Sequence, residues 1–159
     1  WTNDNKPAAS PDTASYLAAW RTNSGPKRTL TCSLFSHRGV RYFGVGGALG
    51  FDTLVAERLL ELRDIISPIK VILVLPFRSY QSRWTPEQQI RAAKIEARVD
   101  KIVYCSDAPS RNAFLYRDRH LVNGSAYCIG YCTRTIGGSA YTLRYAREQG
   151  LTVWNIGEE

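Results

Sequence analysis

The chain has 159 residues, of which 44% are hydrophobic and 22% are charged. This length and composition fit one globular domain with a sizeable core. The longest purely apolar run, Val71 to Pro76, is far shorter than the roughly 20 residues of a membrane helix, and the amino-terminus lacks the apolar segment of a signal peptide. We therefore expect a cytoplasmic protein that neither spans a membrane nor is secreted.

The chain carries a formal net charge of +7, from 21 basic and 14 acidic residues. A basic surface attracts anions, whether nucleotides, nucleic acid or acidic lipid, and composition alone does not choose among them. Arginines outnumber lysines by 16 to 5. That bias suits bidentate recognition of phosphate, although codon usage would produce the same bias.

Four cysteines lie in or beside apolar segments: Cys32, Cys105, Cys128 and Cys132. We expect buried free thiols, which indicate a reducing compartment. Cys128 and Cys132 have no second pair of ligands at zinc spacing, so no metal site is expected.

Residues 1–28 are predicted to be a polar leader segment with one short helix over 12–20. Residues 29–159 are predicted to form one domain in which apolar strands alternate with amphipathic helices. The predicted strands are Leu30–Phe35, Arg41–Val45, Lys70–Leu75, Lys101–Cys105, Ala126–Gly130 and Thr152–Asn155. The predicted helices are Asp52–Arg63, Pro86–Arg98, Ala113–Val122 and Ser139–Gln149. This alternation is typical of βαβ units, so the fold class is α/β with a mainly parallel sheet.

One connection does not fit this pattern. Only about five residues separate Phe35 from Arg41, whereas a parallel crossover needs a dozen or more. Either these two strands form a hairpin, or a helix is absent between them.

The first candidate binding element is a glycine turn that follows the strand ending at Val45. Gly46, Gly47 and Gly50 precede a helix, so backbone N–H groups there could hold a phosphate. The alternative is a tight turn in which Asp52 caps the helix. A carboxylate in the first turn competes with an anion, and Asp52 could instead accept a ribose hydroxyl; Thr53 follows it.

The second candidate element is the pair Gly137 and Gly138, also between a strand and a helix. Ser139 and Thr142 add hydroxyl donors to it. Because ligands of open parallel sheets bind outside the carboxyl ends of the strands, the two turns could hold different parts of one nucleotide. A plain loop at Gly137 is the alternative.

Five further residues could contact a ligand at the same edge. Arg117 and Arg119 could bind an anion or form a solvated charged face. Trp84 could stack on a base or serve as a packing anchor. His37 and Arg38 could reach a phosphate or belong to a surface turn.

Several segments together resemble the YpsA-like branch of the SLOG superfamily. They are GVRYFGVGGALGFDTLVAERLLELR, VILVLPF with Gln81 and Trp84, FLYRDRHLVNGSAYCIGY, and GGSAYTLRYAREQGLTVWNI, and they cover residues 39–156. The resemblance implies a Rossmann-like three-layer sandwich with helices on both faces of the sheet. It also implies binding of a nucleotide or a nucleotide-derived ligand such as NAD or ADP-ribose. The superfamily includes LOG phosphoribohydrolases and DNA-binding DprA proteins.

The sequence departs from the superfamily pattern in two places. Residues 32–38 resemble the family's first strand and turn, with Ser36 in place of a glycine, but the first helix that should follow is absent. In addition, the catalytic glutamate of LOG enzymes corresponds to Arg144 here. The LOG mechanism therefore does not carry over, and it remains open whether the protein is an enzyme.

Three functions follow from these patterns. The first is a regulatory module that binds a nucleotide as a small-molecule partner, requires no cofactor or metal, and is compatible with a homo-oligomer. The second is a nucleotide-cleaving hydrolase that uses Asp52 or Glu57, although Glu57 is also a plausible solvated helix residue. The third is binding of single-stranded nucleic acid, which predicts a steep loss of affinity with salt.

Overall fold

The computed structural model describes residues 17–18, 40–65 and 69–158. The strands are β1 (Leu17–Ala18), β2 (Tyr42–Val45), β3 (Lys70–Leu75), β4 (Lys101–Tyr104), β5 (Tyr127–Gly130) and β6 (Thr152–Asn155). The helices are α2 (Phe51–Ile65), α3 (Pro86–Glu96), α4 (Ala113–Asn123) and α5 (Gly138–Glu148), followed by the 3₁₀ helix η1 (Ile156–Glu158).

The described strands pair in parallel. β2, β3 and β4 form one set and β1, β5 and β6 form another. In register, Tyr42 of β2 lies opposite Lys70 of β3, and Ile72 of β3 lies opposite Lys101 of β4. Because β1 lies beside both β2 and β5, the strands follow the order β4-β3-β2-β1-β5-β6. The strands β2, β3 and β4 thus lie on one side of β1, and the later strands β5 and β6 lie on its other side.

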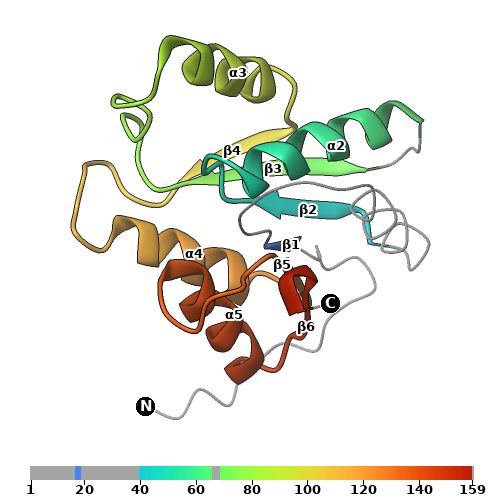
Figure 1. Ribbon diagram of the computed structural model, residues 1–159. Coiled ribbons are helices and arrows are strands. Elements are labelled where there is room, and N and C mark those ends of the chain that lie inside the picture. The colour runs from blue at the N-terminus through green and yellow to red at the C-terminus, as the bar shows by residue number, and fades with distance from the viewer. Residues whose placement is uncertain (1–16, 19–39, 66–68, 159) are drawn as a thin grey trace.

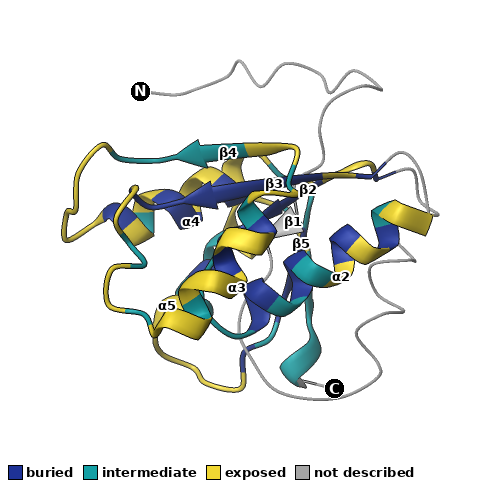
Figure 2. Cartoon of the chain, turned by 90° about the horizontal axis from the view of Figure 1, so that it is seen from above, coloured by how far each residue is buried: buried dark blue, intermediate teal, exposed yellow. Residues whose placement is uncertain are grey.

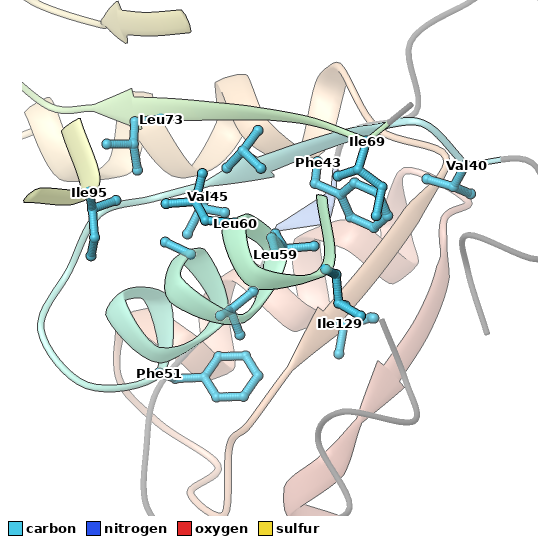
Figure 3. Packing of buried hydrophobic residues seen from close by; sticks show 14 of the residues in the cluster. Val40, Phe43, Val45, Phe51, Leu59, Leu60, Ile69, Leu73, Ile95 and Ile129 are labelled. Carbon is cyan, nitrogen blue, oxygen red and sulfur yellow. The ribbon is translucent and has the colours of Figure 1, made fainter. Parts of the chain in front are cut away.

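Helices cover both faces of this sheet, α2 and α3 on one side and α4 and α5 on the other (Figure 1). On the α2 side, Phe43 and Val45 of β2 pack with Phe51 and Leu59 of α2 (Figure 3). On the α4 side, a second cluster joins alternate residues of β3 to α4, β5 and α5: Ile72, Val74, Leu121, Val122, Cys128 and Leu143. The fold is therefore the Rossmann-like α/β sandwich that the sequence predicts.

Burial separates the middle of the sheet from its edge. After Lys70, every residue of β3 is buried, as expected for a strand with helices on both faces. In β4, Ile102, Val103 and Tyr104 are only half-buried, because β4 has a strand neighbour on one side alone among the described residues. Figure 2 shows this contrast between β3 and β4.

Local sequence explains where α3 begins and where α5 ends. Thr85 and Gln88 form a capping box at the start of α3, and Pro86 occupies its first turn. The end of α5 is followed by Gly150 at φ +78°, a conformation that glycine adopts without strain. None of the described helices has the length and apolarity of a membrane span.

The predicted elements from residue 41 onward are confirmed, with boundaries that differ by a few residues at most. The helix predicted over 12–20 is wrong at Leu17–Ala18, which form β1 and pair with Tyr127 and Cys128 of β5. Pairing with a neighbouring strand here overrides a weak local helical preference. The strand predicted at Leu30–Phe35 and its short connection lie outside the described residues.

Candidate functional site

The candidate site lies at the carboxyl edge of the sheet, the edge at which the parallel strands end. The turn from β2 into α2 and the loop from β5 into α5 both lie there. The order of the strands reverses around β1, next to β2 and β5. In open parallel sheets, ligands bind at such a switch point.

The turn after β2 requires glycine. Gly47 and Gly50 have φ values of +70° and +89°. Residues other than glycine adopt such positive φ values only with strain. Gly46 has a different constraint, because a Cβ there would lie 2.5 Å from Arg117 Nη1 and 2.7 Å from Asp52 Oδ2. The glycine at 46 therefore allows two charged side chains to approach the backbone closely.

Asp52 points into the protein, with a relative exposure of 1%. Its Oδ2 atom accepts a hydrogen bond from the Ala48 N–H at 3.0 Å. The Thr53 hydroxyl donates to the Ala48 carbonyl at 2.9 Å. These two bonds fasten the first turn of α2 to the glycine turn, so the Asp52 carboxylate stabilises the turn from within.

Arg117 of α4 reaches the same turn from the other face of the sheet. Its side chain is 3% exposed, and its Nη1 atom donates to the Gly46 carbonyl. The same Nη1 lies 3.8 Å from Asp52 Oδ2, and Nε donates to Asp118 Oδ1 at 2.6 Å. Arg117 is thus held between two carboxylates and the backbone of the first glycine turn.

Asp118 extends this network to α5. Its Oδ2 atom lies 3.1 Å from Thr142 Oγ1, which in turn lies 3.0 Å from the Gly138 carbonyl. A continuous path of polar contacts therefore runs from Gly46 to Gly138 through Arg117, Asp118 and Thr142. These three side chains are buried, so the path joins the two glycine turns inside the protein.

Burial raises the pKa of Asp118 from 3.8 to about 6, although the charge of Arg117 and hydrogen bonds from Thr142 and Arg117 act in the opposite direction. Desolvation disfavours the ionised carboxylate more than its partners favour it. This carboxyl group therefore changes its protonation state within the range in which most carboxylates are fully ionised.

The start of α5 is open. Gly137 has a φ of +108°, and a Cβ added to Gly137 or Gly138 would have no atom of a non-neighbouring described residue within 4 Å. Gly137 at the N-cap supplies no side-chain hydrogen bond. Since the first N–H groups of a helix have no partner within it, those of α5 are placed to receive an anion, and the helix dipole favours negative charge there.

Tyr80 closes the first glycine turn from the α3 side. Its hydroxyl donates to the Gly47 carbonyl at 3.2 Å and accepts from Gln81 Nε2 at 2.7 Å. Burial raises the pKa of Tyr80 to about 12.

Tyr80 also lines a cavity of about 10 Å³, which is too small for a nucleotide. The ring of Trp84 packs edge-on against Tyr80, with centroids 5.2 Å apart.

The structure brings together only some of the predicted site residues. The buried network joins Gly46, Asp52, Arg117, Gly138 and Thr142. Gly47, Gly50 and Thr53 lie beside it in the first glycine turn and the first turn of α2, and Gly137 and the half-buried Ser139 lie at the start of α5. Arg119 lies instead on the exposed surface of α4, where Nε donates to the Tyr141 hydroxyl at 2.9 Å. His37 and Arg38 lie outside the described residues.

Glu57, a candidate catalytic residue, forms a two-point ion pair with Arg91 of α3. The two N–O distances are both 2.6 Å. Arg144, which the resemblance to LOG enzymes aligns with their glutamate, is exposed on α5 with its guanidinium 6.0 Å from the Tyr141 ring centre. No group of three potential metal ligands occurs within the described part of the chain.

Sequence reasoning missed Asp118 and Tyr80. The buried residues of α4 are Ala113, Arg117, Asp118, Leu121 and Val122, which lie at helical spacing along one stripe. That spacing places Arg117 and Asp118 on the buried face and predicts that the two charges pair. No comparable pattern marks Tyr80.

Residues 28–151 match the sequence profile of the YspA SLOG family. Similar curated proteins include the UPF0398 protein of Oenococcus oeni, which is 27% identical over 77 residues, or 46% of this chain and 41% of the relative. The UPF0398 protein of Lacticaseibacillus casei is 27% identical over 79 residues, or 50% and 41% of the two chains. The matched part therefore spans about two fifths of the length of these relatives.

A solved structure of DNA processing protein A from Helicobacter pylori, described for its mode of binding single-stranded DNA, has a similar fold. The TM-score is 0.62, with 21% sequence identity, over 90% of this chain and 65% of that chain. This similarity concerns the fold alone.

Proposed function

Because the chain belongs to the YspA SLOG family, we propose that it binds the phosphate groups of a nucleotide or nucleotide-derived ligand, of the NAD or ADP-ribose type, at the carboxyl edge of the sheet. The observation that carries this proposal is the open start of α5. Among the described residues, no non-neighbouring atom lies within 4 Å of a Cβ position at Gly137 or Gly138, which leaves space for a ligand beside the first N–H groups of the helix. A diphosphate fits this chemistry because backbone donors and the helix dipole both favour anions.

The buried network supports the proposal by fixing the geometry of the site. Thr142 lies one turn after Gly138 and is fully buried, so it anchors the first turn of α5 to Asp118. Arg117 anchors the Gly46 turn to the same carboxylate. A ligand that contacts both turns would meet donors already held in place, which lowers the ordering cost of binding.

The charges also favour binding over turnover. Asp52 is buried beneath the turn, Glu57 is paired with Arg91, and Arg144 replaces the acid of LOG enzymes. We infer a regulatory or sensing role, in which ligand binding is read through the two turns.

The proposal is tested by isothermal titration calorimetry with ADP-ribose, NAD and AMP, with each mixture analysed afterwards for products. The key variant is Gly138→Ala, which adds a methyl group in open space at the start of α5 and so obstructs an approaching phosphate without disturbing the fold. The matched control is Glu148→Ala, an exposed change at the other end of the same helix.

We expect one of these ligands to bind the wild-type protein and the control variant, and to bind Gly138→Ala at least about tenfold more weakly, since each tenfold corresponds to about 1.4 kcal/mol. Equal binding by Gly138→Ala and the control would contradict the proposed site. Product formation would assign an enzymatic activity instead of a sensing role.

A further inference from the structure

Basic and aromatic side chains gather on the outer surface of α4 and α5. The guanidinium of Arg119 lies 6.0 Å from the Tyr141 ring centre and 5.6 Å from that of Tyr145. The two tyrosine rings are stacked, with centroids 6.0 Å apart and an angle of 5° between them. Arg144 lies over Tyr141 as well.

This surface offers exposed groups to a partner. Tyr116 is 51% exposed on α4 and precedes Arg119 by three residues on the same helix, a spacing at which helical side chains are neighbours. Arg119 and Arg144 are exposed. We call Tyr116, Arg119, Tyr141, Arg144 and Tyr145 the tyrosine–arginine surface.

The charges on the two faces of the sheet differ. On the opposite face, α2 and α3 contain four basic and six acidic residues. Their arginines are paired there: Arg58 with Glu61, Arg91 with Glu57, and Arg63 with Asp100. By contrast, α4 and α5 contain four arginines and two carboxylates.

One of those two carboxylates, Asp118, is buried against Arg117 and does not offset charge at the surface. Within the described ranges, neither Arg119 nor Arg144 has a carboxylate at ion-pair distance. In the part of the chain that the structure describes, Arg119 and Arg144 on the α4–α5 face therefore lack carboxylate partners, whereas the arginines of α2 and α3 are paired.

We propose that the tyrosine–arginine surface binds single-stranded nucleic acid, with Arg119 and Arg144 contacting phosphates and Tyr116 stacking on a base. An accessible tyrosine next to unneutralised arginines matches the recurring chemistry of single-strand binding, which combines a basic track with aromatic platforms. A duplex would not present its base faces to such a ring, and a lipid surface would not need one. The proposal goes beyond the nucleotide site and does not depend on it.

The test is fluorescence anisotropy with a labelled single-stranded oligonucleotide of about 20 nucleotides, measured over a range of salt concentrations. The variants Arg119→Gln and Arg144→Gln each remove one charge from this surface. Arg58→Gln removes one charge from the exposed surface of α2 and is the matched control. Tyr116→Ala and Tyr116→Phe separate stacking from charge.

We expect Arg119→Gln and Arg144→Gln to weaken binding and to reduce the salt slope by about 0.7 for each phosphate that is no longer neutralised. Tyr116→Ala should weaken binding by about fivefold or more, while Tyr116→Phe and Arg58→Gln retain it. Gly138→Ala should also retain it, which distinguishes this surface from the nucleotide site.

Three results would overturn the proposal. The first is absence of binding at low salt. The second is an equal effect of Arg58→Gln and Arg144→Gln, which would assign binding to net charge. The third is competition by inorganic polyphosphate or phosphatidylserine vesicles combined with unchanged binding by Tyr116→Ala, which would assign the surface to anions in general.

Discussion

Thr142 Oγ1 lies 3.1 Å from Asp118 Oδ2 and 3.0 Å from the Gly138 carbonyl. Because a hydroxyl group has a single proton, an ionised Asp118 competes with Gly138 for it. A protonated Asp118 can instead donate to Thr142, which leaves the hydroxyl proton for Gly138. The protonation state of one buried carboxyl group thus determines how the first turn of α5 is held.

Replacing Thr142 with valine should destabilise the protein. Valine has nearly the same shape but leaves Asp118 without its partner on α5, and the loss of a buried hydrogen bond costs about 1–3 kcal/mol. Chemical denaturation measures the free energy of unfolding. Thr142→Ser keeps the hydroxyl and should lose less stability than Thr142→Val. A larger loss in Thr142→Ser than in Thr142→Val would mean that the methyl group, and not the hydrogen bond, supports the site.

The two glycine turns should respond differently to alanine. At Gly46 the new methyl group would collide with Arg117 and Asp52, and such overpacking costs about 1–3 kcal/mol. At Gly138 the methyl group enters open space, and alanine is the better helix former by up to about 1 kcal/mol. Thermal unfolding of both variants tests this contrast; a Gly138→Ala protein less stable than Gly46→Ala would contradict it.

Much of the fold could be predicted from the sequence because its signals are local. The apolar run of β3, Pro86 at the start of α3 and Gly150 after α5 each mark an element within a few residues. β1 could not be predicted in this way, because Leu17 and Ala18 are strand residues only through their pairing with β5.

The candidate site shows the same division. The glycine turns are visible in the sequence, but the link between them depends on Arg117 and Gly46, which are 71 residues apart. Asp52 illustrates the difficulty most clearly. Its place in the first turn of α2 suits either a ligand contact or an internal cap. Only the structure distinguishes the two, because it shows the Asp52 carboxylate buried, bonded to the Ala48 N–H and close to Arg117, as an internal cap would be.

Glu57→Gln should change little. The ion pair of Glu57 with Arg91 is partly exposed, with side-chain exposures of 33% and 47%, and such pairs contribute less than about 1 kcal/mol. We expect the affinity for ADP-ribose or NAD to match that of the wild type, since the Glu57 carboxylate is paired with Arg91 of α3. A nucleotide-cleaving activity that disappears in Glu57→Gln would instead support the hydrolase hypothesis.

Asp118 should give the protein an unusual dependence of stability on pH. Its pKa in the folded state is about 6, above the ordinary value of 3.8, so between these pH values the folded protein binds more protons than the unfolded chain. By linkage, the contribution of Asp118 to stability is fully present below about pH 4 and is lost as pH rises through about 6. A difference of about two units between the folded and unfolded pKa of Asp118 corresponds to about 3 kcal/mol in the free energy of unfolding.

The variant Asp118→Asn cannot titrate, so the decline in its free energy of unfolding between pH 4.5 and pH 7 should be smaller than that of the wild type by about 2 kcal/mol. Asp100→Asn is the control. Although burial raises the pKa of Asp100, hydrogen bonds from Lys70, the Val71 N–H and Arg63 lower it overall. Its contribution is therefore lost only as pH falls below about 4, outside this range. Parallel profiles for Asp118→Asn and the wild type would show that the buried network does not titrate, and that its hold on α5 is independent of pH.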